Sequence, residues 1–550
     1  MCDQVIDGDN GILRPKATPP QVCYISSGKP LKTHSIFCPL PPKHSMELIS
    51  SITLALGVLG CSALVAKWTL SRRKLSLPPG PSLLTVIRDL YRAGSSNSAH
   101  AQFERWARRY GEIFCVSIPG QTIVVLNSVR VIRELFAGAY KTITNDRPPS
   151  FVGKYVFRGC GITFSNAGKY LRKLRQLFHS SVNMHVDGGV KIENTLRSEM
   201  KMTLGDLNIQ AESGTVQLHE IISDYLMNVL HILLTGERPS PGSDNIAIMR
   251  EMDDLLNRSL GLDQESVLTN LPFLRHLPNS YGRRWKKIEA TRAKLTKLFF
   301  TDYKVNFRSG DGVLDTFLEE ASKEDSLVTK DDVLALIFEL VAAGYVTSKS
   351  TLLGMMLMTL HRPDIQQKLQ KEISEVIGDR VPSLKDHANT PYFDAFLFEM
   401  MRFTSQLPLG LPHMIREEIE YKGCRIPQQS LLLPNLYYMN HDPAQWEDPW
   451  QFRPERFLEE DGSLVSPLNE ARQRFVQFGV GKRSCPGQNF ARSRIFMFIV
   501  SMFQQFDILP PDDEPLPSCN PATWEPGLIL MPKYVRCKVR RRQTVPAQTE

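Results

Sequence analysis

A long and mainly apolar stretch, residues 333–360, reads VLALIFELVAAGYVTSKSTLLGMMLMTL. Thr329 lies just before it and is followed by Lys-Asp-Asp, a pattern typical of a helix N-cap with acidic residues in the first turn. Pro363 lies just after it and is expected to begin the next helix. Because a helix that is apolar on nearly all sides has to be buried on nearly all sides, the chain must build a large helical body around this one.

A second apolar stretch, residues 48–66, contains no charged side chain. At about 1.5 Å per residue, a helix of this length nearly spans a hydrocarbon core of about 30 Å. Trp68 follows it, and then the cations Arg72, Arg73 and Lys74. Since interfacial Trp and basic flanks mark the cytosolic end of a membrane helix, residues 48–68 are predicted to anchor the protein, with the rest in the cytosol.

The remaining segments divide the chain of 550 residues by composition. Residues 1–45 are rich in Pro and lack helical periodicity, which predicts an irregular N-terminal extension. Because translation from Met46 would give the anchor a cleaner start, the extension is interpreted as a product of start-site choice. Residues 71–81 are basic and rich in Pro and form a predicted linker, 82–540 form the predicted globular domain, and 541–550 form a C-terminal tail.

The globular domain is predicted to be mostly α, with a small β part near its N-terminus. Residues 112–127, EIFCVSIPGQTIVVLN, read as two strands around a Pro119-Gly120 turn. Helical patterns dominate from about residue 128 to residue 405. No repeat of fixed period is found.

Composition excludes several classes of function. The net charge of +8 is spread along the chain, and no zinc finger, basic helix or long Lys/Arg block suggests nucleic-acid binding. The ten cysteines form no CxxC pair and have no zinc spacing, so neither a disulfide framework nor a zinc site is expected.

Cys485 stands out because of its neighbours in FVQFGVGKRSCPGQNF, residues 475–490. A free cysteine is usually a small buried apolar residue. Here Pro486 suits the first position of a following helix, whose N–H groups and dipole would favour the thiolate. Lys482 and Arg483 add positive charge, and the glycines allow close approach. The pattern predicts a metal ligand or a nucleophile and does not choose between them.

The same stretch resembles the haem-ligand loop of the cytochrome P450 family, FxxGxRxCxG, through Phe478, Gly481, Arg483, Cys485 and Gly487. Glu399-x-x-Arg402 matches the ExxR motif of the family, and FRPERF at 452–457 matches its PERF element. The resemblance implies the fold of that family, haem b as cofactor, Cys485 as the axial ligand of its iron, and a buried cluster of Glu399, Arg402 and Arg456. Residues 82–540 would then be a haem-binding catalytic domain.

The resemblance also implies which residues hold the two haem propionates. They are the residues that match Arg158, Arg175, His413 and Arg483. Where the family usually has a Trp, four residues before the second of these arginines, this chain has Leu171. One propionate hydrogen bond is therefore missing or comes from another group such as Tyr170.

The oxygen-activating helix of the family usually reads (A/G)Gx(D/E)T, and the matching segment is AGYVT, Ala343 to Thr347. By resemblance, Gly344 beside Ala343 opens the helix to O2, and Thr347 stabilises bound oxygen and helps to deliver protons. From the residues alone, Thr347 could instead bond back to a carbonyl of its own helix. Val346 replaces the acid and can neither accept nor donate a proton.

Three functions are compatible with this departure. The first is a monooxygenase with an altered proton route, which the retained Thr347 favours. The second is a haem-thiolate isomerase or dehydratase that acts on peroxides and needs no proton relay. The third is a haem-binding protein with little catalysis.

The resemblance is to microsomal animal members that metabolise drugs and steroids, which implies the endoplasmic reticulum membrane and a cytosolic catalytic domain. The implied partners are NADPH–cytochrome reductase and cytochrome b5. A basic docking face is predicted from Arg172, Lys173, Lys482, Arg492 and Arg494. The substrate is predicted to be a lipophilic small molecule (sterol, fatty acid or xenobiotic), with a pocket formed by residues 151–165, 260–285, 338–347 and 404–415.

Overall fold

The computed structural model describes residues 76–93, 99–186, 190–211, 214–240, 242–259, 262–303 and 312–542. All of them belong to one compact unit, Ser71–Glu550. The predicted extension 1–45 and anchor 48–68 lie outside the described residues, as do parts of the linker 71–81 and the tail 541–550. These four predictions remain predictions.

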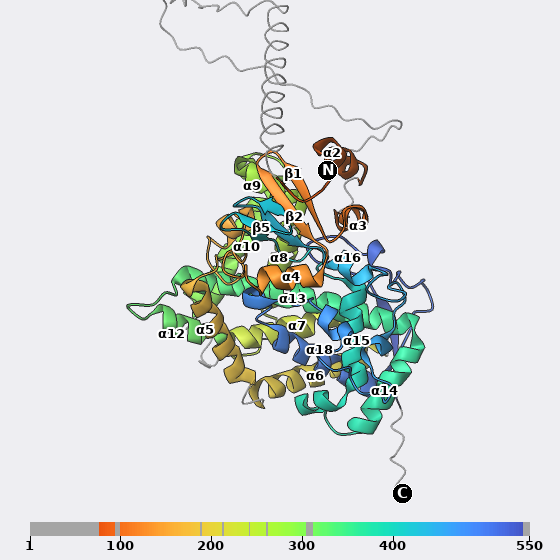
Figure 1. The fold of residues 1–550 in the computed structure, drawn as a ribbon. Coiled ribbons are helices and arrows are strands. Elements are labelled where there is room, and N and C mark those ends of the chain that lie inside the picture. The colour runs from red at the N-terminus through yellow and green to blue at the C-terminus, as the bar shows by residue number, and fades with distance from the viewer. Residues whose placement is uncertain are drawn as a thin grey trace, which may run out of the picture. The chain divides into compact units, whose positions relative to one another are not determined.

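The body is mostly α-helical, as predicted, and its chain order can be followed in Figure 1. The α-helices are α2 Leu83–Ala93, α3 Ala99–Tyr110, α4 Val129–Phe136, α5 Lys169–Val186, α6 Val190–Ala211, α7 Leu218–Thr235, α8 Asn245–Ser259, α9 Leu262–Asn270, α10 Ser280–Thr296, α12 Val313–Ala321, α13 Lys330–His361, α14 Pro363–Val376, α15 Pro391–Thr404, α16 Leu436–His441, α17 Glu470–Arg474 and α18 Gln488–Gln505. Short 3-10 or π segments are η1 Val152–Val156, η2 Pro272–His276, η3 Lys297–Thr301, η4 Leu384–Asn389, η5 Pro454–Phe457, η6 Gly481–Arg483 and η7 Pro521–Thr523.

The strands form three small sheets. They are β1 Ile113–Ile118, β2 Gln121–Leu126, β3 Val216–Gln217, β4 His413–Met414, β5 Ile419–Tyr421, β6 Cys424–Ile426, β7 Leu431–Pro434, β8 Phe506–Leu509 and β9 Arg536–Arg541. The hairpin β1–β2 is confirmed, and Gly120 takes the positive φ that its turn requires. β2 pairs in parallel with β7, and β7 pairs with β4, which gives the order β1-β2-β7-β4.

The prediction that the β part lies near the N-terminus is therefore incomplete. The partner strands of the hairpin come from residues 413–434, and the sheet β3-β9-β8 uses residues 216–217 and 506–541. Strands this short are stabilised by partners distant in sequence rather than by their own pattern.

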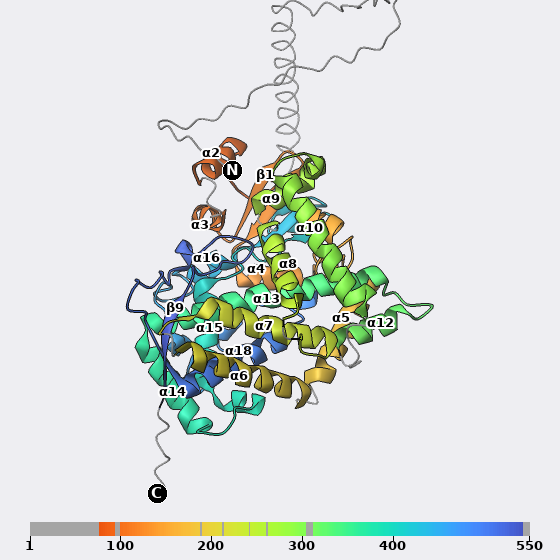
Figure 2. The same cartoon turned by 180° about the vertical axis from the view of Figure 1, so that it is seen from behind.

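Helix α13 crosses the interior of the body beside α7 and α18, as the two opposite views show (Figures 1 and 2). Its predicted start is confirmed, because Thr329 Oγ1 accepts from Asp332 N at 3.3 Å and Asp332 Oδ2 accepts from Thr329 N at 2.8 Å. Among the described residues α13 alone is long and apolar enough to cross a membrane, but 72% of its most apolar window is buried inside the body. It is a core helix, and Pro363 begins α14 directly after it.

Candidate haem site

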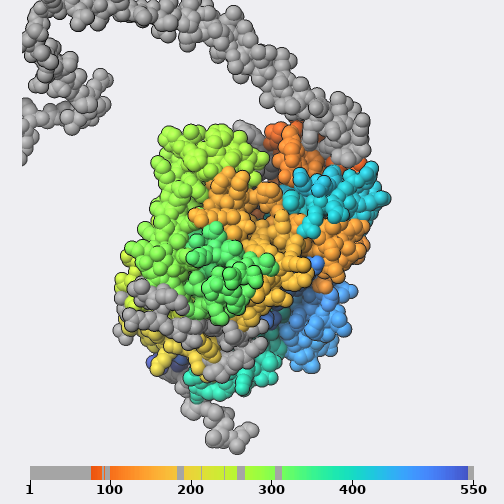
Figure 3. Space-filling view, turned by 90° about the vertical axis from the view of Figure 1, so that its left-hand side faces the viewer, coloured from red at the N-terminus to blue at the C-terminus, as the bar shows by residue number. Residues whose placement is uncertain are grey.

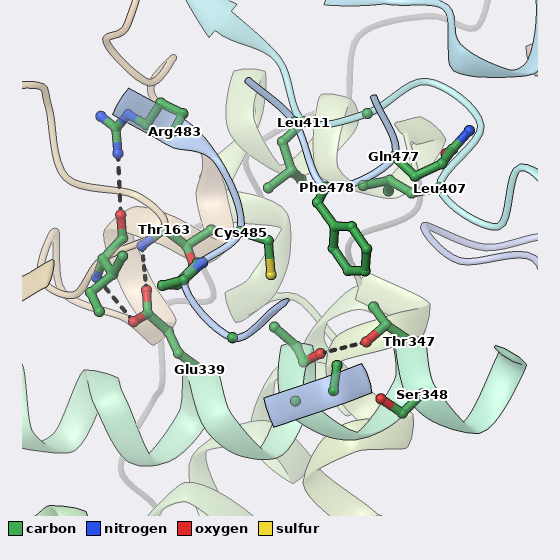
Figure 4. A pocket seen from close by; sticks show the side chains of 18 of the residues that line it. Thr163, Glu339, Thr347, Ser348, Leu407, Leu411, Gln477, Phe478, Arg483 and Cys485 are labelled. Carbon is green, nitrogen blue, oxygen red and sulfur yellow. Dashed lines mark hydrogen bonds between the residues drawn. The ribbon is translucent and has the colours of Figure 1, made fainter. Parts of the chain in front are cut away.

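The loop that carries Cys485 is held tightly against the body. Cys485 N donates to Phe478 O at 2.7 Å, and Gly479 and Gly481 take φ values of 70° and 67° in between. A Cβ added at Gly481 would lie 2.6 Å from Phe136 O, so no larger residue fits without a shift of the backbone. The loop presents Sγ of Cys485, and the ring of Phe478, to an internal cavity (Figure 4).

The helix after the loop begins later than predicted. Gly487 is the N-cap of α18 and Gln488 is its first residue, so Pro486 is not the first helical position. Burial raises the pKa of the Cys485 thiol, while the Gly487 amide and the cations Arg175 and Arg494 lower it by less. These are not the cations that the sequence suggested. Coordination to a metal would remove the thiol proton, because a bound cation outweighs such local effects.

The cavity has a volume of about 300 Å³ and lies between the Cys485 loop and α13. Its α13 wall includes the predicted residues Ala343, Gly344 and Thr347. Figure 4 shows Thr347 on α13 across the cavity from the sulfur of Cys485. A second cavity of about 250 Å³ shares Ala343 and Thr347 with the first, so α13 borders both.

Three of the four predicted propionate contacts line the first cavity. Arg175 Nη2 donates to Ser484 O at 2.8 Å, which fixes α5 against the Cys485 loop. Arg483 donates from Nε to Asn145 O at 2.8 Å and from Nη1 to Ile162 O at 3.2 Å. Since both cations bond only neutral carbonyls here, their charge is available to an anion in the cavity.

His413 is the third of these contacts, and its ring stacks on Phe136 with centroids 3.8 Å apart. Nδ1 lies 3.0 Å from Thr144 O, and because a carbonyl only accepts, Nδ1 carries the proton. Burial first, and then the charge of Arg147, lower the pKa of His413 well below its usual value. With its proton on Nδ1, the neutral ring has none on Nε2. Nε2 could therefore donate a hydrogen bond to a carboxylate only after the ring had bound a second proton.

The fourth contact, Arg158, does not line either cavity. It is exposed and forms an ion pair with Asp331 at 3.1 Å. Tyr170 does not replace the missing Trp either, because its hydroxyl donates to Asp332 and it lines neither cavity. The family match at Arg158, and the place of Tyr170 next to Leu171, do not reveal which way the two side chains turn.

Arg147 is a cation that sequence reasoning missed. It is buried, lines both cavities, and donates from Nη1 to Pro412 O at 2.7 Å and from Nε to Thr163 O at 3.0 Å. Burial, with smaller effects of Arg483 and Arg175, lowers its pKa to about 9. The only sequence signal was its place in the loop NDRPPSF, where an exposed arginine would look the same.

The side chains on α13 have mixed roles. Thr347 Oγ1 donates to Ala343 O at 3.0 Å, so it does bond back to its own helix. A Cβ added at Gly344 would lie 3.1 Å from Leu230 Cδ2, so it would fit only if that leucine side chain shifted by a few tenths of an ångström. Val346 is buried and lines the second cavity. The position where the family usually has an acid therefore offers no proton to that cavity.

The predicted buried cluster is formed behind the site. Arg402 Nε donates to Glu399 Oε2 at 2.7 Å, and both side chains are fully buried. Arg456 Nε lies 3.4 Å from Glu399 Oε1. The remaining donors of Arg402 reach Asn440 O and Pro449 O, each at 2.8 Å, so the charges are fully hydrogen-bonded, as a buried ion pair requires.

The predicted docking cations do not share one environment. Arg172 and Lys482 are exposed. Lys173 pairs with Glu320 at 2.6 Å, and Arg492 pairs with Asp394 at 2.7 Å. Arg494 is only 1% exposed, so its assignment to a docking face was wrong.

The second cavity receives residues from all four ranges predicted to form the substrate pocket, including Phe157, Glu265, Val346 and Leu409. It also receives residues outside those ranges, namely Ala99, His100, Arg147, Pro148, Ser150, Asp253, Leu433 and residues 527–529. Tertiary contacts bring these segments together, and no local pattern marks them.

The donor set fits a flat anionic macrocycle that needs a soft axial ligand. The cavity offers one thiol, four arginines that form no ion pair with any described residue, one buried acid, Glu339, and mostly apolar walls. A Cβ added at Gly487, which lines the cavity, would meet no atom within 4 Å, so that space is left for something other than the protein.

The family model described as Cytochrome P450 matches residues 78–539. The chain belongs to the cytochrome P450 family. It is 29% identical to human Cytochrome P450 2U1 over 522 residues, which covers 89% of this chain and 94% of the relative. It is 28% identical to Farnesoate epoxidase of Bombyx mori, covering 86% and 95%, and 30% identical to human Cytochrome P450 2D6, covering 80% and 89%.

Membership settles the class of cofactor and reaction. Cytochromes P450 bind haem b through a cysteine thiolate, and this one is an oxidoreductase of the monooxygenase class. The predicted haem-thiolate chemistry is thereby confirmed at the level of the family.

Proposed function

We propose that this cytochrome P450 holds haem b through Sγ of Cys485 and inserts one oxygen atom of O2 into a lipophilic small molecule, with electrons derived from NADPH. One observation carries the proposal: Cys485 faces Thr347 of α13 across one cavity, which Gly344 also lines. Haem b bound to a thiolate supplies the binding of O2 and the cleavage of its O–O bond.

The cations around the cavity position the cofactor in this proposal. Arg175, Arg483 and Arg147 carry positive charge in its wall, and His413 adds a ring nitrogen. Guanidinium groups suit carboxylates because their N–H donors match both oxygens. Arg147 takes the place that the resemblance gave to Arg158.

Thr347 and Gly344 form the oxygen side. Gly344 leaves this part of the wall without a side chain. Thr347 uses its proton on Ala343 O, so its oxygen accepts a hydrogen bond from water or a ligand, and the side chain must leave Ala343 before it donates. Since Val346 carries no proton, the proton route runs through water or through hydroxyl groups such as those of Thr347 and Ser348.

The second cavity is the proposed substrate site. Its walls are mostly apolar and include Phe157, Leu409 and Val346, which favours a lipophilic ligand (a sterol, a fatty acid or a xenobiotic). One relative is named for the epoxidation of farnesoate, an apolar chain with a carboxylate, which is compatible with such walls. The electron donor is proposed to be NADPH–cytochrome reductase, with cytochrome b5 as a second partner, at the endoplasmic reticulum membrane to which residues 48–68 attach the cytosolic domain.

The test is spectroscopic. Reduced protein with carbon monoxide should show the red-shifted Soret band of thiolate ligation, and Cys485→Ala should abolish it. Cys424→Ala is the matched control, because this half-buried free cysteine in β6 lies outside both cavities. An unchanged band in Cys485→Ala would rule out this ligand.

An isomerase or dehydratase that acts on peroxides is the second candidate, and Val346 is the observation that favours it, since such chemistry needs no proton relay. Turnover with NADPH and reductase should be compared with turnover of hydroperoxides and endoperoxides alone. NADPH-dependent oxygenation supports the monooxygenase. Rearrangement of peroxides without any NADPH-dependent product would contradict it.

A further inference from the structure

Arg494 lies deep inside the body, on α18, where this helix contacts α13. It is 1% exposed, yet it lines the same cavity as Cys485, Gly344 and Thr347. Its Nη2 donates to Gly344 O and, at 2.6 Å, to Ser348 Oγ. Thus one guanidinium contacts the oxygen-side helix on both sides of Thr347 in the sequence.

The charge of Arg494 has no acidic partner. No carboxylate lies within ion-pair distance of it in the part of the chain that the structure describes. Its Nε and Nη1 have no hydrogen-bond partner, and the Phe490 ring lies 4.8 Å from its Cζ. A buried charge without a partner is strongly unfavourable, so the burial of Arg494 calls for a negative charge nearby.

Two groups act on Arg494 electrostatically, Tyr225 and Cys485. Burial raises the pKa of Tyr225 far above neutral pH, so Tyr225 is uncharged there. Burial also lowers the pKa of Arg494 to about 10, which leaves it protonated near pH 7. Once Cys485 is a thiolate bound to iron, it is the negative charge that Arg494 faces.

We infer that Arg494 is a positioning residue that serves as the counter-charge of the Cys485 thiolate and fixes α13 at Gly344. The inference rests on the proposed function, because it needs haem bound through Cys485. It joins the two sides of the site, since the same guanidinium that acts on the thiolate holds the helix that carries Thr347.

The physical consequence is a change in how strongly the thiolate donates to the iron. A nearby fixed cation stabilises negative charge on sulfur and favours the reduced, more electron-rich state of the iron–sulfur pair. Inside the body this effect is little screened by salt. Loss of the cation should therefore lower the reduction potential and leave the thiolate without its buried counter-charge.

A purely structural role is the alternative. Arg494 could serve only to pack over Phe490 and to bond Gly344 O, in which case any loss would appear in stability and not in the potential. Arg494→Met keeps most of the side-chain volume and removes the charge, whereas Arg494→Lys keeps the charge and loses the fork-shaped donors.

The experiment compares haem-loaded wild type with Arg494→Met, Arg494→Lys and Arg492→Met. Arg492 lies on the same helix but pairs with Asp394 outside the cavity, so it is the matched control. We expect Arg494→Met to shift the reduction potential to more negative values and to speed several-fold the loss of the red-shifted carbon monoxide band in mild denaturant. Arg494→Lys and Arg492→Met should stay near wild type in potential.

Two results would overturn the inference: an unchanged potential in Arg494→Met, or an equal shift in Arg494→Lys. A fall in thermal stability in both variants without a shift of potential would assign Arg494 to packing alone. These outcomes differ from failure of the proposed function, which would show as an absent thiolate band already in the wild type or as a band that survives Cys485→Ala.

Discussion

At the scale of single residues, Glu339 is a buried carboxylate that borders both cavities. Its Oε2 accepts from Ile162 N at 2.9 Å and its Oε1 from Thr163 N at 2.6 Å (Figure 4). A Cβ at Gly161 would lie 2.7 Å from Oε1, so the loop reaches Glu339 only because this residue is glycine. Glu339 therefore fixes the loop that also receives the Arg483 donor.

Burial raises the pKa of Glu339 from 4.5 to about 7, against the opposing effect of the two amide donors. A carboxyl with a raised native pKa binds more protons in the folded state, so its stabilising contribution is present below pH 4.5 and is lost as the pH rises through 7. Relative to Glu339→Gln, wild type should lose stability between pH 5 and pH 8, by at most roughly 3 kcal/mol. Unfolding midpoints measured across this range check the prediction.

Glu372 provides a comparison, because burial likewise raises its pKa to about 7 and it accepts from Tyr392 N and Phe393 N away from both cavities. Glu372→Gln should show the same dependence of stability on pH. Only Glu339→Gln should change the pH dependence of ligand binding in the second cavity. If wild type instead lost stability relative to Glu339→Gln as the pH falls, the two amide donors would outweigh burial.

At the scale of elements, Glu399 and Arg402 form an ion pair within α15, and Arg402 joins this helix to Asn440 O and Pro449 O, in the segment that leads to the Cys485 loop. Glu399 Oε1 also accepts from Arg453 N at 2.8 Å, next to η5. Arg402→Met would leave Glu399 buried without its main partner, which typically costs about 3–5 kcal/mol. We expect most of the expressed protein to lack haem, as measured by the ratio of Soret to protein absorbance.

Two further variants test the reason for that loss. Because Glu399→Gln combined with Arg402→Met removes both charges, the double variant should retain more haem than Arg402→Met alone. Arg380→Lys alters a half-exposed pair with Asp386 and should cost under about 1 kcal/mol. Equal haem loss in the single and double variants would mean that shape, and not the unpaired charge, sets the cost.

At this scale, the sequence predicted those elements whose start or turn is determined by residues close to it in the chain. The start of α13, the hairpin β1–β2 and the start of α14 follow from a capping box, a Pro-Gly turn and a proline, each within a few residues. The pairing of β2 with β7 joins residues about 300 positions apart and has no local signal. The same holds for the side chains at the site.

Arg494 and Arg158 illustrate the limit. In the sequence both are single arginines, one beyond the Cys485 loop and one matching a family contact. Packing buries Arg494 against Gly344 and turns Arg158 outward to Asp331. The charge of a residue is evident from the sequence, but the identity of its partner is decided by which helices pack together.

At the scale of the whole molecule, the net charge of +8 predicts a partner only when it is known where on the surface the unpaired cations lie. Arg175 fixes α5 to the Cys485 loop through Ser484 O, so Arg172 on α5 and Lys482 in the loop belong to two elements that meet on the thiolate side. Both are exposed, and neither forms an ion pair with any described residue. Figure 3 shows the surface of α5 beside that of α12, where Lys173 pairs with Glu320.

An acidic reductase docking on this side would be attracted by Arg172 and Lys482 and much less by Lys173, whose charge Glu320 offsets. Turnover supported by reductase should fall as salt rises, because the attraction acts across exposed surfaces. Arg172→Glu with Lys482→Glu should raise the reductase concentration needed for half-maximal turnover about tenfold or more, since each reversal replaces attraction by repulsion. Lys173→Gln is the control and should change it little. Turnover driven by peroxide bypasses the reductase and should be equal in all three proteins, so a matching loss there would place the effect in the haem site and not in docking.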